Sequence, residues 1–315
     1  MAAEDLQRIF RTLSDPTRIR ILTALQREEL AVQELMEVLG MAQSRVSRHL
    51  AILREAGLIR DRRNGTYVFY RFAVPADGPW HETWELISRN LSRDSTVERD
   101  AASLARVLEA RADRARNFFD SVGPEWDALR KIFADDVLRA RAITRLVPPN
   151  LKVADCGTGT GILAIELAQR GLQVIAIDHS PRMLDAARSK LREAGVEGVE
   201  LRQGDLSAMP LADDEVGAAL AHMVLHYLPS PAEAIREMAR AVAPGGSVVV
   251  VDFVAHEHEW MREELGVTWL GFELDEVESW FDACGLQDLQ CESHPGLSAG
   301  RNLPATFIAS GRTPR

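Results

Sequence analysis

The residues best suited to chemistry lie in the second half of the chain. Residues 155–161 read Asp-Cys-Gly-Thr-Gly-Thr-Gly and connect a predicted strand to a predicted helix. Glycines in such a turn let a ligand approach the backbone and the electropositive end of the helix. Glycine-rich turns are common by themselves, so the function of this one depends on what surrounds it.

Two carboxylates that follow later strands fit the same ligand. Asp178 ends a predicted strand at 173–178, where its oxygens could accept both hydroxyls of a ribose. Asp205 follows a short predicted strand at 199–202, where it could accept the exocyclic amine of an adenine. One nucleoside accounts for the glycine-rich turn and for both carboxylates.

Side chains near the ends of other strands could act on a bound molecule. His222 and His226 lie four residues apart, so they could share one helix face and serve as a base or as metal ligands. Tyr227 follows them, and His256 comes after a further predicted strand. These four residues form a candidate acceptor cleft, although a helix cap or a histidine at the edge of the core is the simpler explanation. We assign no catalytic residue and no metal site.

A second kind of chemistry is expected at the N-terminus, because charge is segregated along the chain. Residues 1–75 contain twelve Arg, no Lys and nine Asp or Glu, which gives a net charge of +3. The whole chain carries −10, so the remaining residues carry −13. A small arginine-rich module on an acidic partner indicates that only the N-terminal part meets an anionic polymer.

Three short helices and a hairpin are predicted to position these arginines. Asp15 followed by proline is a typical helix start, and Gly40 and Gly57 are typical helix ends. Asn64-Gly65 between two β-rich runs predicts a hairpin with a type I′ turn. The order of these elements is that of a winged helix-turn-helix. The expected helices are 15–26, 32–39 and 42–56, and the expected strands are 58–63 and 66–72.

The third predicted helix presents a face suited to the major groove of DNA. Val46, Leu50 and Leu53 would face the core, which leaves short polar side chains and one arginine on the opposite face. Arginines of the hairpin would reach phosphates or the minor groove. The alternative, an ordinary solvated surface, leaves the charge segregation unexplained. The predicted DNA-contacting residues are Gln43, Ser44, Ser47, Arg48, Arg60, Arg62 and Arg63.

Residues 5–75 resemble the ArsR-type winged-helix transcriptional regulators. The segments that carry the resemblance are 13–22 (LSDPTRIRIL), 47–50 (SRHL) and 53–59 (LREAGLI). The resemblance implies a homodimer that binds an inverted repeat in double-stranded DNA, usually as a repressor that an inducer releases. Metal-sensing members place cysteines in the segment equivalent to 29–35. Ala31 and Gln33 stand in that segment here, which excludes a thiolate metal sensor of this kind.

Residues from about 118 to 312 resemble the class I S-adenosylmethionine-dependent methyltransferases. Besides the patterns above, the resemblance rests on the segments 219–222 (ALAH), 225–228 (LHYL) and 243–252 (APGGSVVVVD). It implies S-adenosylmethionine or S-adenosylhomocysteine as the ligand. A nicotinamide-dependent dehydrogenase would leave Gly204-Asp205 and the Pro-Gly-Gly of 244–246 unexplained. By this resemblance Asp155, Gly157, Gly159 and Gly161 line the methionine end, Asp178 and Met183 the ribose and adenine, and Asp205 with Leu206 the adenine.

The expected architecture is therefore multidomain, with an α+β winged helix-turn-helix followed by a Rossmann-like α/β domain. The length of 315 residues, with 46% hydrophobic and 27% charged residues, suits two globular domains. We expect a DNA-binding domain at 1–75, a helical linker or dimerisation segment at 76–120 and a methyltransferase-like domain at 121–315.

The middle segment has its own helical stripe, which needs a partner. The stripe could pack against a second copy of itself in a dimer or against the following domain, and either way it would connect the two domains. Its apolar members are Val97, Ala101, Leu104, Leu108, Ala112, Ala115 and Phe119, which repeat every three or four residues.

Several other classes of protein are not expected. No run approaches the roughly 18 apolar residues of a membrane span, and the first residues do not form a secretion signal. The three cysteines, Cys156, Cys284 and Cys291, form no C-x-x-C pair, so neither a disulfide framework nor a thiolate zinc site is indicated. A cytoplasmic protein without a membrane partner fits best.

Two functions from different classes follow. In the first, which we favour, the methyltransferase-like domain senses S-adenosylmethionine or S-adenosylhomocysteine and controls DNA binding. This arrangement resembles S-adenosylhomocysteine-responsive regulators. In the second, the protein is an active methyltransferase of a small molecule whose DNA-binding domain regulates its own gene. The sequence leaves enzymatic activity open.

Overall fold

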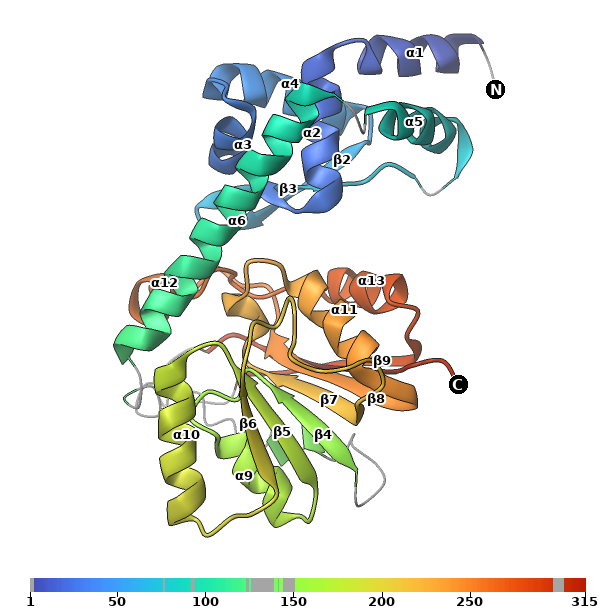
Figure 1. Ribbon diagram of the computed structural model, residues 1–315. Helices are drawn as coiled ribbons and strands as arrows, with labels where there is room; N and C mark the ends of the chain where they lie inside the picture. The colour runs from blue at the N-terminus through green and yellow to red at the C-terminus, as the bar shows by residue number, and fades with distance from the viewer. Residues whose placement is uncertain are drawn as a thin grey trace. The chain divides into compact units, whose positions relative to one another are not determined.

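The computed structural model describes residues 3–75, 77–91, 94–122, 125, 139–140, 142–143, 151–296 and 303–315. The chain forms two compact units, Met1–Ala110 and Arg111–Arg315. The boundary falls inside the long helix α6, Ser95–Val122, so this helix contributes residues to both units. Figure 1 labels most of the helices and strands of each unit.

Unit 1 is a winged helix with additional helices. Its small sheet has the strand order β1-β3-β2, and both pairings are antiparallel. The predicted helix-turn-helix and hairpin are confirmed, and α5 lies in the segment expected to be a helical linker, whereas helix α1 was not predicted. The elements are α1 (Ala3–Leu13), α2 (Pro16–Arg27), β1 (Leu30–Ala31), α3 (Val32–Leu39), α4 (Gln43–Glu55), β2 (Ile59–Asn64), β3 (Tyr67–Phe72), α5 (Gly78–Leu91) and the first half of α6.

Local chemistry explains where the two central helices of unit 1 begin and end. The Asp15 side chain accepts a hydrogen bond from the backbone N–H of Thr17 at 2.8 Å, which caps α2 as expected. Gly40 adopts the left-handed conformation, with φ of 64°, and ends α3. Asp15 therefore fixes the start of α2, and Gly40 sets the tight turn between α3 and α4.

The predicted type I′ turn of the hairpin is wrong by one residue. Asn64 pairs with Tyr67 across the two strands, so the two-residue loop is Gly65-Thr66. A type I′ turn needs positive φ at both central residues, but only Gly65 has it, with φ of 61°. The Asn64 side chain is buried at the end of β2, which keeps this residue in the strand.

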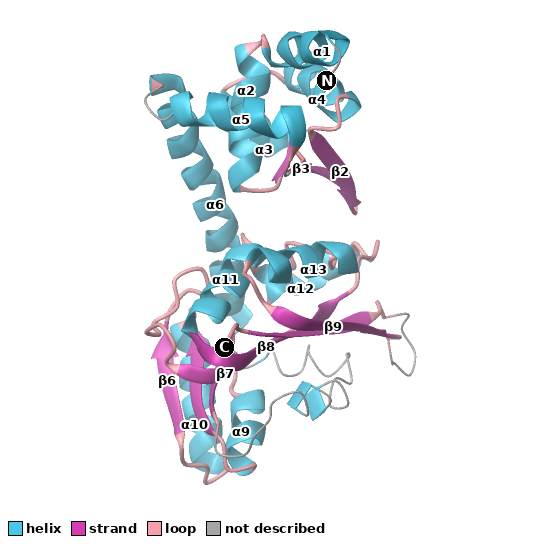
Figure 2. Ribbon diagram, turned by 90° about the vertical axis from the view of Figure 1, so that its right-hand side faces the viewer, coloured by secondary structure: helices cyan, strands magenta, loops and turns pink. Residues whose placement is uncertain are grey.

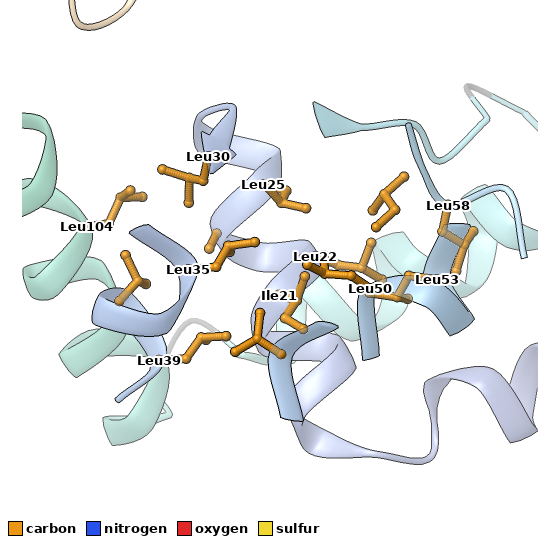
Figure 3. Packing of buried hydrophobic residues seen from close by; sticks show 14 of the residues in the cluster. Ile21, Leu22, Leu25, Leu30, Leu35, Leu39, Leu50, Leu53, Leu58 and Leu104 are labelled. Carbon is orange, nitrogen blue, oxygen red and sulfur yellow. The ribbon is translucent and has the colours of Figure 1, made fainter. Parts of the chain in front are cut away.

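One hydrophobic core holds unit 1 together, and the first half of α6 belongs to it. Figure 3 shows leucines from α2, α3 and α4 packed with Leu104 of α6. Leu104 and Val107 are only 3% and 4% exposed. Arg20 of α2 makes a two-pronged ion pair with Asp100 of α6, at 2.6 and 2.7 Å. This part of the predicted stripe is therefore covered within its own unit.

Unit 2 is a Rossmann-like α/β domain, as expected, with a seven-stranded sheet of order β6-β5-β4-β7-β8-β10-β9. The first five strands in this order are parallel, and β10 runs antiparallel to both of its neighbours. The strands are β4 (Lys152–Cys156), β5 (Gln173–Asp178), β6 (Val199–Gln203), β7 (Val216–His222), β8 (Val242–Phe253), β9 (Gln287–His294) and β10 (Thr306–Arg312).

Helices cover both faces of this sheet, with α9 and α10 on one face and α11 and α13 on the other (Figure 2). Because both faces are covered, β7 is buried along nearly its whole length and β8 is buried from Ser247 to Phe253. Among the described residues no helix is long and apolar enough to cross a membrane. The helices are α9 (Ile162–Gln169), α10 (Pro181–Glu193), the 3-10 turn η3 (Leu225–Tyr227), α11 (Pro231–Ala241), α12 (Trp260–Leu265) and α13 (Leu274–Ala283).

The strand order changes direction at β4, which has β5 on one side and β7 on the other. In open parallel sheets the crevice outside the carboxyl ends of the strands at such a switch point is the usual place for a ligand. The glycine-rich turn after β4, the acid that ends β5 and the histidine that ends β7 all lie at this edge.

Candidate nucleoside cleft and DNA-contacting surface

Unit 2 contains a cleft at this edge of the sheet. Its empty volume, including the part open to solvent, is about 1000 Å³. A cleft of this size can hold a ligand of nucleoside dimensions. The predicted site residues that line it are Gly157, Gly159, Asp178, Met183, Asp205, Leu206, His222, His226 and Tyr227, whereas Asp155, Gly161 and His256 do not.

The glycines of the turn after β4 serve different purposes. A Cβ at Gly157 would come within 2.4 Å of Val224, and one at Gly161 within 2.9 Å of Ala187. These two glycines therefore permit close packing inside the domain. A Cβ at Gly159 would meet nothing within 4 Å, so the backbone here faces open space in the cleft. Gly159 has φ of 54°, a conformation that L side chains adopt at a cost.

Asp155 lies behind this turn rather than in the cleft. It is 1% exposed, and its carboxylate accepts a hydrogen bond from the Thr158 hydroxyl at 2.6 Å. Thr158 and Thr160, which the sequence analysis did not select, line the cleft instead. Asp155 thus holds the turn in shape, and the turn presents Thr158 to a ligand.

Asp178 ends β5 and reaches the cleft. One carboxylate oxygen accepts the Gly159 N–H at 2.8 Å, and the other accepts the Ser180 N–H at 2.9 Å. Burial raises the pKa of Asp178, while the nearby His179 and these N–H groups oppose the rise. Each oxygen of a carboxylate has a second acceptor site, so both can still take a hydroxyl from a ligand.

Asp205 also lines the cleft, next to the apolar Leu206 in the sequence. One of its carboxylate oxygens accepts hydrogen bonds from the backbone and the hydroxyl of Ser207 at 2.9 and 2.8 Å. The other lies 3.8 Å from a guanidinium nitrogen of Arg116. Met183 and Leu206 are buried and also line the cleft. The cleft thus offers an acceptor and apolar surface, the combination that an adenine edge and face require.

The second half of α6 forms part of the same cleft, so this half of the predicted stripe packs against the domain that follows it. Ala112, Arg116 and Phe119 all line the cleft. Phe119 packs edge-on against Tyr227, with ring centroids 4.6 Å apart. Arg111 anchors this half of the helix, because it is 2% exposed and donates to the carbonyl of Pro229 at 3.2 Å.

The three candidate histidines occupy distinct environments. His226 Nδ1 lies 2.6 Å from Asp252 Oδ1, and both side chains are almost fully buried. His222 ends β7 and is 8% exposed. His256 is outside the lining of the cleft, and burial lowers its pKa to about 3. The pairing of His226 with a carboxylate has the form of an acid–base site. Its partner, Asp252 near the end of β8, lies 26 residues away in the sequence.

In unit 1 the predicted DNA-contacting face of α4 is exposed. Gln43, Ser44, Ser47 and Arg48 are all exposed, whereas Val46, Leu50 and Leu53 are buried in the core. Arg45, which was not selected, is also exposed at the start of this helix. An exposed N-terminal turn with arginine and short polar side chains suits the major groove.

The arginines of the hairpin divide into two groups. Arg60 and Arg63 are exposed on β2. Arg62 instead forms an ion pair with Glu29, with 2.7 Å between Nε and the carboxylate, and its side chain is only 14% exposed. Arg62 therefore ties the hairpin to the segment before α3, and Arg60 and Arg63 remain the predicted phosphate contacts of the hairpin.

Comparisons with known proteins match both regions of the chain. Residues 15–61 match the family model described as bacterial regulatory protein, arsR family, and residues 154–250 match that of a methyltransferase domain. The demethylmenaquinone methyltransferase of Corynebacterium kroppenstedtii is 33% identical over 151 residues, which are 47% of this chain and 63% of that protein. An uncharacterized methyltransferase of Mycobacterium tuberculosis, Rv3342, is 40% identical over 124 residues, 39% of this chain and 49% of that protein. The chain thus spans less than two thirds of the length of these relatives.

Solved structures share the fold of unit 2. A chain of the complex that contains the Haloferax volcanii Trm112 methyltransferase activator matches with a TM-score of 0.56 and 21% identity, over 64% of this chain and 98% of that one. The [4+2]-cyclase SpnF matches with a TM-score of 0.55 and 20% identity, over 63% of this chain and 94% of that one. At these identities the likeness concerns the fold alone.

Proposed function

We propose that this chain, which joins an ArsR-type DNA-binding region to a class I methyltransferase domain, is a transcriptional repressor that responds to a nucleoside. The effector is S-adenosylhomocysteine or S-adenosylmethionine, and the repressor acts in the cytoplasm as a homodimer on an inverted repeat. The observation that carries the proposal is α6, because one helix supplies residues to the core of unit 1 and to the ligand cleft of unit 2.

The cleft residues suit such a nucleoside. The open backbone at Gly159 and the Thr158 side chain would hold the methionine end, and Asp178 would accept the ribose hydroxyls. Asp205 would accept the adenine amine, between the apolar side chains of Met183 and Leu206. A carboxylate that accepts two ligand hydroxyls contributes charge-assisted hydrogen bonds, which are among the stronger polar contacts.

Signal transfer would run along α6. Arg116 and Phe119 respond to what occupies the cleft, because both line it. Asp100 and Leu104, earlier on the same helix, contact Arg20 and the leucine core that supports α4. A ligand changes DNA affinity only if it binds the DNA-competent and DNA-incompetent forms unequally. In this proposal α6 shifts when the ligand binds, so the two forms bind the ligand with different affinities.

The test is a titration of both nucleosides into the full-length protein during binding to the DNA upstream of its own gene. Couplings of about 1 to 3 kcal/mol are typical, so operator affinity should change about 5- to 150-fold at saturation. We expect S-adenosylhomocysteine to be the stronger effector. By linkage, the operator should change nucleoside affinity by the same factor.

The matched control is Arg48→Ala, which should weaken operator binding and leave nucleoside binding unchanged, because Arg48 is an exposed residue of α4 in unit 1.

Identical operator affinity with neither, either or both nucleosides would refute the sensor proposal. The second candidate function, methyl transfer to a small molecule with autoregulation through the DNA-binding region, would then stand. The pairing of His226 with Asp252 in the cleft favours that activity in its own right.

A further inference from the structure

A buried histidine–carboxylate pair forms part of the cleft wall. His226 Nδ1 and Asp252 Oδ1 lie 2.6 Å apart, with side-chain exposures of 3% and 0%. The backbone fixes both partners: Asp252 accepts the Phe253 N–H at 2.8 Å, and the carbonyl of His226 accepts N–H bonds from Thr268 and Trp269. The pair is therefore held in one geometry from η3, β8 and the segment before α13.

The arrangement defines the tautomer of the histidine. An ionised carboxylate can only accept a hydrogen bond, so the neutral tautomer that pairs with it has its proton on Nδ1 and its lone pair on Nε2. His226 lines the cleft and Asp252 does not, so the imidazole stands between the carboxylate and the cavity. Asp252 is then the positioning residue, and its charge stabilises the imidazolium that forms when His226 takes a proton.

The neighbouring tyrosine cannot take the same role. Burial raises the pKa of Tyr227 well above its ordinary value, and the charge of Asp252 raises it further. Tyr227 therefore keeps its proton and can donate a hydrogen bond in the cleft. His226, in contrast, has a carboxylate next to Nδ1, and in its neutral form Nε2 can accept a proton.

The surroundings of His226 indicate the class of acceptor. Phe119, Tyr227 and Phe253 line the cleft with it, and the His226 ring centroid lies 4.1 and 4.9 Å from those of Tyr227 and Phe253. Aromatic walls favour an aromatic ring, which stacks or packs edge-on against them. A carboxylate acceptor is already ionised at neutral pH and needs no base, whereas an aromatic hydroxyl, with a pKa of about 10, does.

We propose that His226 is the general base for methylation of an aromatic hydroxyl in this cleft, with Asp252 as its positioning residue. The acceptor O–H proton passes to Nε2 of His226. The acceptor oxygen forms a bond to the methyl carbon while the carbon–sulfur bond of the sulfonium breaks and sulfur keeps the electron pair. The products are the methyl ether, S-adenosylhomocysteine and a protonated His226, which returns its proton to solvent. The inference rests on the proposed nucleoside for its methyl donor and is independent of DNA binding.

The first test is spectroscopic. 4-Nitrophenol absorbs visible light only as the phenolate, so it reports proton transfer without turnover. At a pH below the pKa of the free probe, full-length protein saturated with S-adenosylhomocysteine should bind it largely as the phenolate. His226→Gln should lower the ionised fraction of the bound probe about tenfold. Asp252→Asn should lower it by less, because the base remains but loses its charged partner.

The matched control is His258→Gln, a histidine outside the cleft lining, which should ionise the probe as the wild type does. The second test is methyl transfer to a panel of phenols from S-adenosylmethionine, where His226→Gln should reduce kcat about 100- to 10,000-fold. Calorimetry with S-adenosylhomocysteine, run on every variant, reports whether the cleft is intact.

Each outcome decides between the proposals. Equal ionisation by the wild type and by a His226→Gln protein that still binds the nucleoside refutes the base. A protein that binds S-adenosylhomocysteine but no phenol refutes the acceptor class. If His226→Gln does not fold, the wild type alone decides, because binding of the un-ionised probe contradicts the inference. If the wild-type protein binds neither nucleoside, the proposed sensor is refuted instead. The general base can then still be tested by titrating 4-nitrophenol into the protein without a nucleoside.

Discussion

The ion pair between Arg20 and Asp100 is predicted to hold the first half of α6 on unit 1. The guanidinium makes two contacts to the carboxylate, at 2.6 and 2.7 Å, and a third to the carbonyl of Leu39 at 2.9 Å. The side chains are 21% and 12% exposed, so the pair is only partly screened by water. Loss of one partner from a fully buried pair costs about 3 to 5 kcal/mol. Because Arg20 keeps the Leu39 contact and some solvent, Asp100→Ala should cost about 2 to 3 kcal/mol.

Hydrogen exchange in the full-length protein measures this loss where it occurs. The slowest amides of α2 should exchange about 30- to 160-fold faster in Asp100→Ala, the equivalent of that free energy. The control is Glu85→Ala, which removes an exposed pair with Arg89 in the same unit, with side chains 52% and 74% exposed. Its effect should be about twofold at most. Equal exchange in the two variants would refute the reasoning. If α6 also carries the signal, Asp100→Ala should reduce the effect of the nucleoside on operator affinity.

Three further predictions address the ligand, the DNA and acid stability. Asp178→Ala should lower nucleoside affinity about ten- to a hundredfold by calorimetry, because a charged double acceptor is lost, and unchanged affinity in a folded variant would contradict the ribose assignment. Arg48→Ala should weaken binding to the specific operator by about 1 to 3 kcal/mol, whereas Arg63→Ala should weaken all sequences nearly alike and reduce the salt dependence, both measured by titration at several salt concentrations. Burial lowers the pKa of His256 to about 3 from 6.5, so the unfolded chain binds this proton first and stability should fall as the pH drops from about 6.5 towards 3. His256→Gln should abolish that part of the loss, seen as a smaller shift of the urea midpoint between about pH 7 and pH 5.

The parts of the fold that local patterns encode were predictable from the sequence. Asp15 and Gly40 bound α2 and α3 where capping chemistry places them. The hairpin was also correct, but its turn was not, because the burial of Asn64 is a tertiary effect that the Asn-Gly pattern does not encode. Helix α5 lies in the predicted helical linker, but its packing into unit 1 was missed for a similar reason. Trp84 anchors it in the core of unit 1, a contact made with residues far away in the sequence.

The site was predictable in its chemistry and less so in its geometry. The spacing of glycines and acids indicated a nucleoside, yet spacing alone does not separate a residue that lines a cleft from one that supports the lining. Asp155 belongs to the second kind, because it accepts the Thr158 hydroxyl from behind the turn. The pairing of His226 with Asp252 depends on parallel strands β7 and β8 ending side by side, so no local pattern could reveal it.

The position of Asp155 also bears on which nucleoside is the stronger effector. S-adenosylmethionine and S-adenosylhomocysteine differ by a methyl group and a positive charge on sulfur. An acidic side chain at the methionine end would favour the sulfonium, whereas an apolar lining would favour the neutral thioether. Asp155 is 1% exposed and outside the lining, while Met223 and Val224 line the cleft on the neighbouring segment. On this reasoning we propose S-adenosylhomocysteine as the tighter ligand. In a regulator this preference reports accumulated product of methylation, and in an enzyme it makes the product an inhibitor. The same cleft chemistry is compatible with a sensor and with an enzyme. Ionisation of a bound phenol distinguishes the enzyme from the sensor.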